Sequence, residues 1–482
     1  MAGIHAADIS PESPASEHDG VARRFALLGS GEALARCAAF GTMALLAHRV
    51  SAEGFGIIAF ATAVVLYLSR IADAGIDLGV GVREVASSRH RLGEIVPAVL
   101  ALRLVLAMGL VATFGLGALL WNKPEGRILA LYTLTLLPLA GGVRWVLTGL
   151  ERTAVVGAAR TTGEIATLCA VALSVHGVED LWRVPVAQLA GDSLAMLILW
   201  SRIRRLGVPL RPRWNGEVVR RLRHHMAPFV GSTLLGLVIY NSDLLFLRFL
   251  RDSAAVGYYA AAYALVSFLI NVSSMYFLTL LPALSRLNAE PETQRALYAD
   301  SVAHVLAVVL PVAVGGAIVS DAVVRLAFGE AFAPSGPVLG LLMMSVPLFA
   351  LRDVTSGAIL SRGREDVVFR ISSAAAALNV VLNVLFIAPY GMFGAVAATL
   401  LTELLRLLMC VGAAHSLGYP WPPLVRAWRP LVAAIAMGGT LLALPTRAVW
   451  ITIPLGAAVY VAALVCVRGV KRGSGGLPSL DV

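Results

Sequence analysis

An aspartate interrupts a long apolar stretch in the middle of the chain. The segment APFVGSTLLGLVIYNSDLLFLRFL, residues 227–250, has no charged side chain before Asp243, and Arg248 follows five residues later. A carboxylate in apolar surroundings is costly unless it is paired, hydrogen-bonded or bound to a cation. We therefore expect Asp243 either to pair with an arginine or to take part in ion coupling.

Other charged residues also lie deep in apolar runs and share helix faces. Glu32 and Arg36 are one helical turn apart, and Arg70, Asp73 and Asp77 are spaced to lie on one face. The remaining charges of this kind are Arg103, Arg144, Glu164, Asp192, Arg352, Asp353, Glu403 and Arg406. Pairs such as Glu32–Arg36 serve equally well to lower the cost of inserting a helix into lipid. Charges near helix ends, such as Asp77 and Arg144, can instead extend to the surface.

The basic residues inside these runs are arginines, with no lysine among them. A guanidinium group is planar and always charged, and it binds phosphate through two parallel hydrogen bonds. A cavity with several arginines therefore favours an anionic, phosphate-bearing ligand over a cationic one. Arg36, Arg103 and Asp243 lie furthest from the ends of their apolar runs, which makes them the strongest candidates for a functional role.

Motifs of soluble enzymes do not occur in the sequence. No Gly-Lys pair forms a phosphate-binding loop, no His is followed by Glu, and GDSLA at 191–195 departs from the nucleophile elbow at its last position. The four cysteines, Cys37, Cys169, Cys410 and Cys466, lie in apolar runs without metal-ligand spacing. We therefore expect no catalytic residues, no metal and no cofactor other than a coupling ion or proton.

The composition is that of a membrane protein. Hydrophobic residues make up 58% of the 482 residues and charged residues 14%, and the mean hydropathy is +0.80. A soluble domain has about 25% charged residues. Such a chain belongs in a lipid bilayer, and its net charge of +10 is interpreted as a topology signal, without a nucleic-acid partner.

Dividing the chain at charged or turn-rich breaks predicts about fourteen transmembrane helices in an all-α fold. The predicted spans are 25–48, 55–77, 95–121, 128–149, 154–176, 181–201, 226–250, 255–284, 299–320, 335–360, 367–388, 392–414, 429–446 and 448–467. Pro430, Pro445 and Pro454 interrupt the last two spans.

The distribution of basic residues predicts the topology. With the N-terminus inside, cytoplasmic segments hold 25 Arg and Lys residues and outer segments hold eight, so both termini are expected in the cytoplasm. The predicted parts are a disordered tail (1–24), an N-terminal six-helix bundle (25–201), a basic cytoplasmic linker (202–225), a C-terminal six-helix bundle (226–416), helices 13–14 (427–468) and a cytoplasmic tail (469–482). Anchoring to anionic lipid is the simplest role for the linker.

The two halves show a weak sequence repeat. VSAEGFGIIAFATAVVLYL (50–68) resembles RDSAAVGYYAAAYALVSFL (251–269), with Gly56 opposite Gly257, and LLGSGEAL (27–34) resembles FVGSTLLG (229–236). The repeated helices are six helices apart and have the same orientation. This pattern predicts two pseudo-symmetric bundles related by an axis along the membrane normal.

Three further stretches resemble a known family. They are FGIIAFATAVVLYLSRIADAGIDLGVGVREVA, NSDLLFLRFLRDSAAVGYYAAAYALVSFLINVSSMYFLTLLPALSRL and LNVVLNVLFIAPYGMFGAVAATLLTELLR, joined by LSRGREDVVF (360–369). Their order resembles the polysaccharide/oligosaccharide flippases of the multidrug/oligosaccharidyl-lipid/polysaccharide exporter superfamily. The resemblance covers most of residues 25–416.

The resemblance implies two six-helix bundles around a central cavity lined by helices 1, 2, 7 and 8. It implies alternating access that moves a lipid-linked oligosaccharide, usually on undecaprenyl pyrophosphate, across the bacterial inner membrane. The family pattern carries over at Asp73-Ala74-Gly75, which closes helix 2, and at Asn241-Ser242-Asp243 in helix 7. Arg36 fits the family's tendency toward basic residues in the cavity. The predicted cavity residues are Glu32, Arg36, Arg70, Asp73, Arg103, Asn241, Asp243 and Arg352.

Other functions remain open at this point. A cation-coupled multidrug exporter of the same superfamily is the main alternative, and twelve helices with an acidic, aromatic cavity would favour it. A polytopic glycosyltransferase or polymerase would need a larger outer loop, and a passive scaffold would need no buried charges. For the flippase we expect membrane lipids, a polysaccharide polymerase and glycosyltransferases as partners, in lipopolysaccharide O-antigen or exopolysaccharide synthesis.

Overall fold

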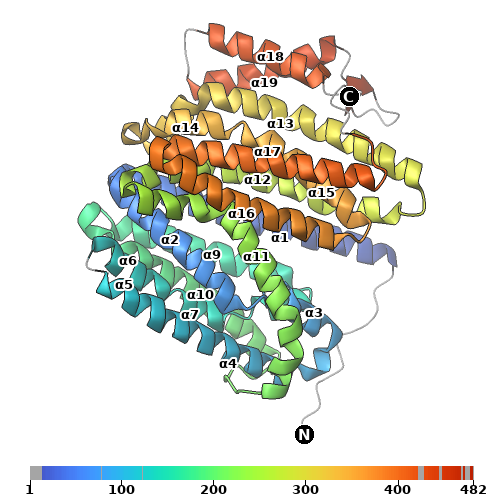
Figure 1. Cartoon of the computed structure of the whole chain (residues 1–482). Coiled ribbons are helices and arrows are strands. Elements are labelled where there is room, and N and C mark those ends of the chain that lie inside the picture. The colour runs from blue at the N-terminus through green and yellow to red at the C-terminus, as the bar shows by residue number, and fades with distance from the viewer. Residues whose placement is uncertain are drawn as a thin grey trace. The chain divides into compact units, whose positions relative to one another are not determined.

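The computed structural model of the chain is helical almost throughout (Figure 1). The structure describes residues 14–77, 79–121, 123–421, 428–444, 448–467, 470–472 and 478–480. The first ten helices are α1 Pro14–Arg49, α2 Ala52–Asp73, α3 Val80–Ser87, α4 Leu92–Leu110, α5 Leu116–Leu120, α6 Pro124–Thr133, α7 Leu136–Gly141, α8 Arg144–Gly149, α9 Thr153–Ser174 and α10 Arg183–Arg205. A π-helical turn at Val111–Gly115 joins α4 to α5.

The second half continues with longer helices. They are α11 Gly216–Leu250, α12 Ser253–Arg286, α13 Pro291–Phe328, α14 Ser335–Leu342, α15 Ser345–Ser361, α16 Glu365–Tyr390, α17 Met392–Ser416, α18 Trp428–Ala443 and α19 Val449–Cys466. Short 3₁₀ turns occupy Arg89–Arg91, Val178–Asp180 and Glu330–Phe332. Two short strands, β1 Val470–Arg472 and β2 Pro478–Leu480, pair antiparallel within the predicted C-terminal tail.

The helices confirm a multi-pass membrane protein. Within the described residues, eleven helical segments are long and apolar enough to cross a bilayer. The other three predicted spans fall in α1, α9 and α18, and α18 has only 16 residues. The count of fourteen spans therefore stays a prediction. Helix α1 begins at Pro14, inside the segment for which the sequence predicts a disordered tail, and residues 1–13 lie outside the described part.

Contacts divide the chain into two compact units. Unit 1 comprises Met1–Met43 and Val65–Val230, and unit 2 comprises Ala44–Val64 and Gly231–Val482. Helices α1, α2 and α11 each contribute to both units, whereas the predicted bundles assign each helix to one half. The end of the first predicted span and the start of the second, Ala44–Val64, thus pack with the second half of the chain.

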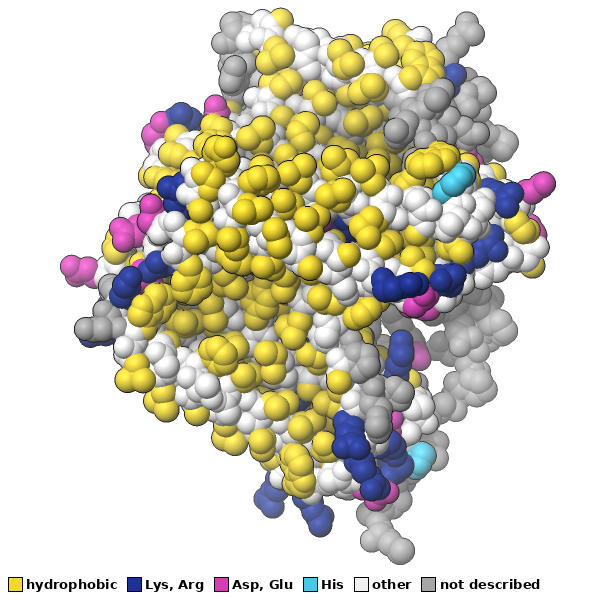
Figure 2. Space-filling view, viewed as in Figure 1, with side chains coloured by type: hydrophobic (Ala, Val, Ile, Leu, Met, Phe, Trp, Pro, Cys, Tyr) yellow, Lys and Arg dark blue, Asp and Glu magenta, His cyan; other side chains and the backbone are white. Residues whose placement is uncertain are grey.

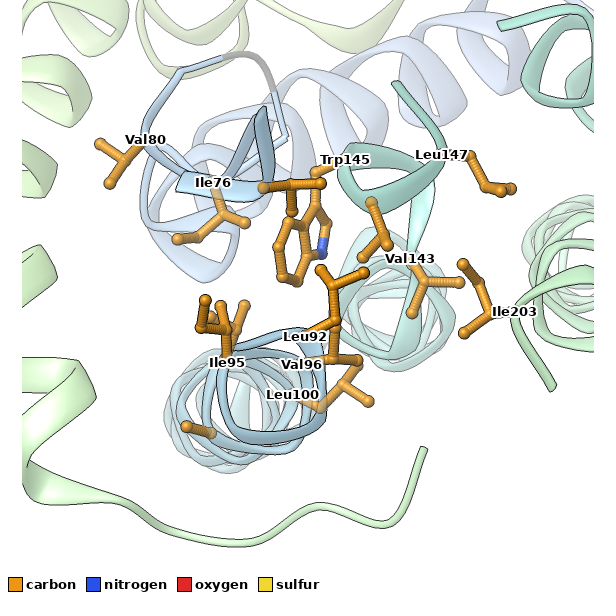
Figure 3. Close-up of a cluster of buried hydrophobic side chains, with 14 of the residues drawn as sticks. Ile76, Val80, Leu92, Ile95, Val96, Leu100, Val143, Trp145, Leu147 and Ile203 are labelled. Carbon is orange, nitrogen blue, oxygen red and sulfur yellow. The ribbon is translucent and has the colours of Figure 1, made fainter. Parts of the chain in front are cut away.

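A large aromatic side chain lies at the centre of the unit 1 core. Trp145 at the start of α8 is fully buried and is surrounded by Ile76, Leu92, Val96 and Val143 (Figure 3). The same cluster includes residues from α10 and from the segment that leads into α11. Burying this much apolar surface fixes the ends of α2, α4 and α8 next to one another.

Unit 2 is built around α12, α13, α15 and α17, and the hairpin of α18 and α19 packs on α13. The Tyr460 hydroxyl on α19 donates to the Ala307 carbonyl at 2.6 Å, and Met437 on α18 is buried in the same cluster. Hydrophobic side chains cover most of the face shown in Figure 2, and charged side chains gather towards its edges. Such a surface suits lipid contact.

The two glycines that the sequence repeat aligns contact each other in unit 2. A Cβ atom on Gly56 would lie 1.7 Å from the Ser253 carbonyl oxygen, and one on Gly257 would lie 2.0 Å from the Ala52 carbonyl oxygen. Only glycine allows two helix backbones to approach this closely, as in membrane helix pairs with small residues four apart. Helices α2 and α12 therefore cross reciprocally, which agrees with the sequence repeat.

Candidate functional sites in the two units

Two arginines share one carboxylate inside unit 1. Arg36 Nε on α1 donates to Glu32 Oε1 at 3.1 Å, and Arg160 Nη1 on α9 lies 2.8 Å from both Glu32 oxygens. The side chains of Arg36, Glu32 and Arg160 are 35%, 25% and 41% exposed. Helices α1 and α9 can approach because Gly31 packs on the backbone of Gly157. The guanidinium groups are thus held in place but remain accessible.

Two more carboxylates lie in the same part of unit 1. Glu164 on α9 interacts electrostatically with Arg160 and Glu32. Asp192 on α10 accepts a hydrogen bond from Gln188 at 3.2 Å and interacts electrostatically with Glu164 and Arg160. The cluster therefore has both charge signs, with an acidic side formed by α9 and α10 next to the arginine pair.

Arg103 joins two helix breaks of unit 1. Helix α2 ends at Asp73 because Ala74 and Gly75 adopt positive φ angles of 53° and 74°. Fully buried Arg103 on α4 contacts Asp73 at 3.2 Å and Asp77 at 3.0 Å. It also donates to the carbonyls of Leu139 and Gly142, where α7 and α8 separate. This geometry is structural, because the terminal nitrogens of Arg103 are all engaged.

Arg70 is placed differently from Arg103. It lies in the last turn of α2, within unit 1, and its side chain is half-buried. Its buried Nε has no hydrogen-bond partner among the described residues, and the same is true of the Nε of Arg103. The difference lies in the terminal nitrogens: those of Arg103 are engaged, whereas Arg70 makes no ion pair within the described residues, so its charge is available to an anionic ligand.

Asp243 is held by neutral donors in unit 2. Its side chain is fully buried on α11 and accepts hydrogen bonds from Tyr259 at 2.5 Å, from Asn383 at 2.9 Å and from Thr399 at 2.9 Å. These residues come from α12, α16 and α17, so three helices converge on one carboxylate. The arrangement does not include the arginine partner that we considered from the sequence.

The polar network around Asp243 extends along α16. Ser242 donates to Asn379 at 2.8 Å and accepts from Asn383 at 3.1 Å, and Asn379 in turn donates to Thr402 at 3.3 Å. The Oδ1 atom of Asn383 is buried and has no hydrogen-bond partner within the described residues. Asn241, the neighbouring predicted residue, is half-buried and lies outside this network.

Arg352 belongs to a second network of unit 2. It donates to Glu403 at 3.0 Å and to the Tyr240 hydroxyl at 3.0 Å, and it contacts Asp353 at 2.8 Å. Arg406 donates to the same Tyr240 hydroxyl at 3.0 Å and to Glu403 at 3.4 Å. Because two arginines meet two carboxylates here, the formal charge is balanced.

The eight predicted cavity residues thus fall into separate clusters. Arg36 with Glu32, and Arg103 with Asp73, lie in unit 1, whereas Asp243 and Arg352 lie in two networks of unit 2. Several residues of these clusters were not predicted from the sequence as site residues: Arg160, Tyr240, Tyr259, Asn379, Asn383 and Thr399. A signal for the asparagines was present, because LNVVLN places Asn379 and Asn383 one turn apart in an apolar run.

The chain matches a known protein family over its first half. Residues 21–288 match the family model described as polysaccharide biosynthesis protein. A curated relative, the probable low-salt glycan biosynthesis flippase Agl15 of Haloferax volcanii, is 23% identical over 185 residues. That match covers 38% of this chain and 39% of the relative, so it spans about two-fifths of Agl15.

Solved structures share the fold. The lipid II flippase MurJ in an inward closed conformation superposes with a TM-score of 0.77 at 14% identity, covering 92% of this chain and 98% of that chain. An inward-facing multidrug resistance MATE family transporter of the MOP superfamily gives a TM-score of 0.62 at 13% identity, covering 80% and 95%. The chain is thus a multi-pass membrane protein with the helical fold of these transporters. It belongs to the polysaccharide biosynthesis protein family.

Proposed function

We propose that the protein is a flippase for a polyprenyl-pyrophosphate-linked oligosaccharide or polysaccharide repeat unit. It moves this lipid across the bacterial cytoplasmic membrane by alternating access, for surface polysaccharide biosynthesis. The observation that carries the proposal is the family match over residues 21–288 in a chain with charged clusters inside its helical units. The fold shared with a lipid II flippase and the name of the glycan flippase relative support it.

Arg36, Arg70 and Arg160 are the proposed contacts for the pyrophosphate. Arg36 and Arg160 remain about a third or more exposed although they share Glu32, and the half-buried Arg70 makes no ion pair among the described residues. Arg103 and Arg352, by contrast, already donate to carboxylates, carbonyls or a hydroxyl. We therefore assign these two a structural role and the first three a role in ligand binding.

Asp243 is the proposed coupling group. A buried carboxylate is surrounded by the hydroxyl oxygens of Tyr259 and Thr399 and by the unpartnered amide oxygen of Asn383. Rotation of these groups would offer several oxygen ligands, which fits a monovalent cation or a proton on the carboxylate. Binding at this point would change how α11, α12, α16 and α17 pack, and this change would couple an ion gradient to transport.

A cation-coupled multidrug exporter is the second candidate. Glu32, Glu164 and Asp192 place three carboxylates in one part of unit 1, and an acidic cluster suits a cationic cargo. Both candidates place the protein in the inner membrane with cytoplasmic termini. They differ in the charge of the cargo, and only the flippase requires a lipid-linked glycan and the partner enzymes that make and polymerise it.

Transport by the purified protein tests the proposal. Proteoliposomes would contain a fluorescent polyprenyl-pyrophosphate oligosaccharide, and its accessibility to a membrane-impermeant quencher would be followed with and without an ion gradient. We expect transport of this lipid and no uptake of cationic dyes. Arg36→Lys should slow transport, because an ammonium cannot reproduce two parallel hydrogen bonds. Dye transport without glycan-lipid transport would establish the multidrug exporter and refute the flippase.

A further inference from the structure

The basic segment between the two halves is an ordered surface of unit 1. Eight arginines occur in residues 202–223 and all are exposed: Arg202, Arg204, Arg205, Arg211, Arg213, Arg220, Arg221 and Arg223. The segment has one acidic residue, Glu217. Arg221 pairs with Glu84 of α3 at 2.7 Å. Within the described residues, the other seven arginines form no ion pair with a carboxylate, which leaves a strong local excess of positive charge.

Apolar contacts hold this segment against the core. Leu210, Val218 and Leu222 are buried in the same cluster as Trp145, and the Arg213 backbone N–H donates to the Pro97 carbonyl at 3.1 Å. Asn215 accepts hydrogen bonds from the first backbone N–H groups of α11 and so caps this helix. The arginines are therefore presented by a fixed backbone and not by a free linker.

The first turns of α11 project beyond the apolar span. Helix α11 begins at Gly216, but the uncharged apolar run within it begins only at Met226. By the rise of about 1.5 Å per residue, Arg223 lies about 5 Å and Arg220 about 9 Å before this apolar run. The headgroup layer of one leaflet is about 5–8 Å thick. These side chains, which are several ångströms long, reach the phosphate level of a leaflet.

An exposed aromatic residue lies beside the arginines. Trp214 precedes α11 and its side chain is 57% exposed. Tryptophan is enriched at the membrane–water interface, where its ring lies among headgroups. Figure 2 shows Lys and Arg side chains grouped at the lower end of the molecule, where Figure 1 places the first turns of α11.

We propose that residues 202–223 form a docking surface for the headgroups of anionic phospholipids, with Trp214 as the interfacial anchor. The positive charge is complementary to lipid phosphates, and the apolar side of the segment is already covered by unit 1. The surface holds one end of α11 against the leaflet, and α11 is a helix that both units share. This proposal is independent of the cargo that the protein carries.

Lipid-selective quenching of Trp214 tests the proposal. The full chain is placed in phosphatidylcholine nanodiscs with either brominated phosphatidylglycerol or brominated phosphatidylcholine, and the Trp214 signal is taken as the difference from Trp214→Phe. We expect stronger quenching by the anionic lipid. Each arginine near an anionic surface contributes about five-fold in lipid affinity, so Arg213→Gln/Arg220→Gln/Arg223→Gln should lower the preference at least tenfold. Added salt should lower it as well.

Two matched variants complete the test. Replacing the same three arginines by lysine should keep the preference, because headgroup attraction needs charge and not a guanidinium. Lys123→Gln/Arg127→Gln changes two basic residues at the start of α6 in unit 1 and should leave the Trp214 signal unchanged. Equal quenching of the wild-type protein by both lipids would overturn the proposal and point to an acidic protein partner. A preference that survives the triple glutamine variant would overturn it too.

Discussion

Substitutions at Glu32, Arg36 and Arg160 separate a structural ion pair from a ligand site. Glu32 receives one contact from Arg36 at 3.1 Å and two from Arg160 at 2.8 Å. Partly exposed ion pairs contribute about 0.2–1 kcal/mol, and hydrogen bonds to charged groups about 1.5–3 kcal/mol. We expect Glu32→Gln to lower the free energy of unfolding by about 1–3 kcal/mol. Arg36→Gln should cost about 0.2–1 kcal/mol, because Arg160 still neutralises Glu32.

The double variants give the sharper result. If Glu32 and Arg36 formed an isolated pair, Glu32→Gln/Arg36→Gln would recover most of the stability lost in Glu32→Gln. The structure predicts no such recovery, because Arg160 then loses both contacts with Glu32 and keeps only its longer-range interactions with Glu164 and Asp192. Recovery requires Arg160→Gln in addition. Thermal and denaturant unfolding of the purified variants in one detergent measures these differences, with the expressed amounts matched.

Transport distinguishes the ligand role from the structural one. Arg36→Lys keeps the charge next to Glu32 and should retain stability, but it should slow the transport of a pyrophosphate-linked cargo. Transport by Arg36→Lys at the wild-type rate would remove Arg36 from the ligand site. A fully stable and active Glu32→Gln/Arg36→Gln variant would refute the reasoning, because Arg160 would then contribute nothing to the cluster.

Three other substitutions test the packing and the coupling. Gly56→Ala places a Cβ against a carbonyl oxygen of α12, so it should lower the free energy of unfolding by about 1–3 kcal/mol and slow transport. An unchanged stability and transport rate would contradict the tight crossing of α2 and α12. Arg103→Met leaves Asp73 and Asp77 without their buried partner and should lower the free energy of unfolding by about 3–5 kcal/mol. Changing both aspartates to asparagine as well should restore the yield of folded protein. A normal yield from Arg103→Met alone would disprove the structural role of Arg103. Asp243→Asn should fold normally but transport independently of ion gradients, as ionophores would show; transport that still follows the gradient would exclude Asp243 as the coupling group.

The sequence predicted the helical membrane fold because apolar length is a local property. It also predicted Glu32 next to Arg36, since residues four apart meet on one helix face. It could not predict Arg160 as the third member, because Arg160 is 128 residues from Glu32 in the chain. Partners of this kind depend on how helices pack, and helical periodicity alone does not determine the packing.

The partners of Asp243 also could not be identified from the sequence. The sequence indicated that a carboxylate in an apolar run needs a partner, and it offered an arginine or an ion. The structure supplies neutral donors from three other helices instead, among them Tyr259 and Thr399. Asn383 carried a usable signal, because an amide inside an apolar run is itself costly and must meet another polar group. The spacing from Asn379 to Asn383 predicts a polar helix face, but not which carboxylate it meets.

The distance of an arginine from the ends of its apolar run did not distinguish structural arginines from accessible ones. Arg36 and Arg103 both lie far from the ends of their apolar runs, yet the Arg103 side chain is 0% exposed and that of Arg36 is 35% exposed. Arg103 binds carbonyls where α7 and α8 separate, so a ligand could engage it only by breaking those bonds. The backbone carbonyls at a helix break need hydrogen-bond donors, and a buried arginine that supplies them has a structural role. The arginines that a phosphate can reach are those whose side chains stay partly exposed, and this is why Arg36, Arg70 and Arg160 carry the proposed site.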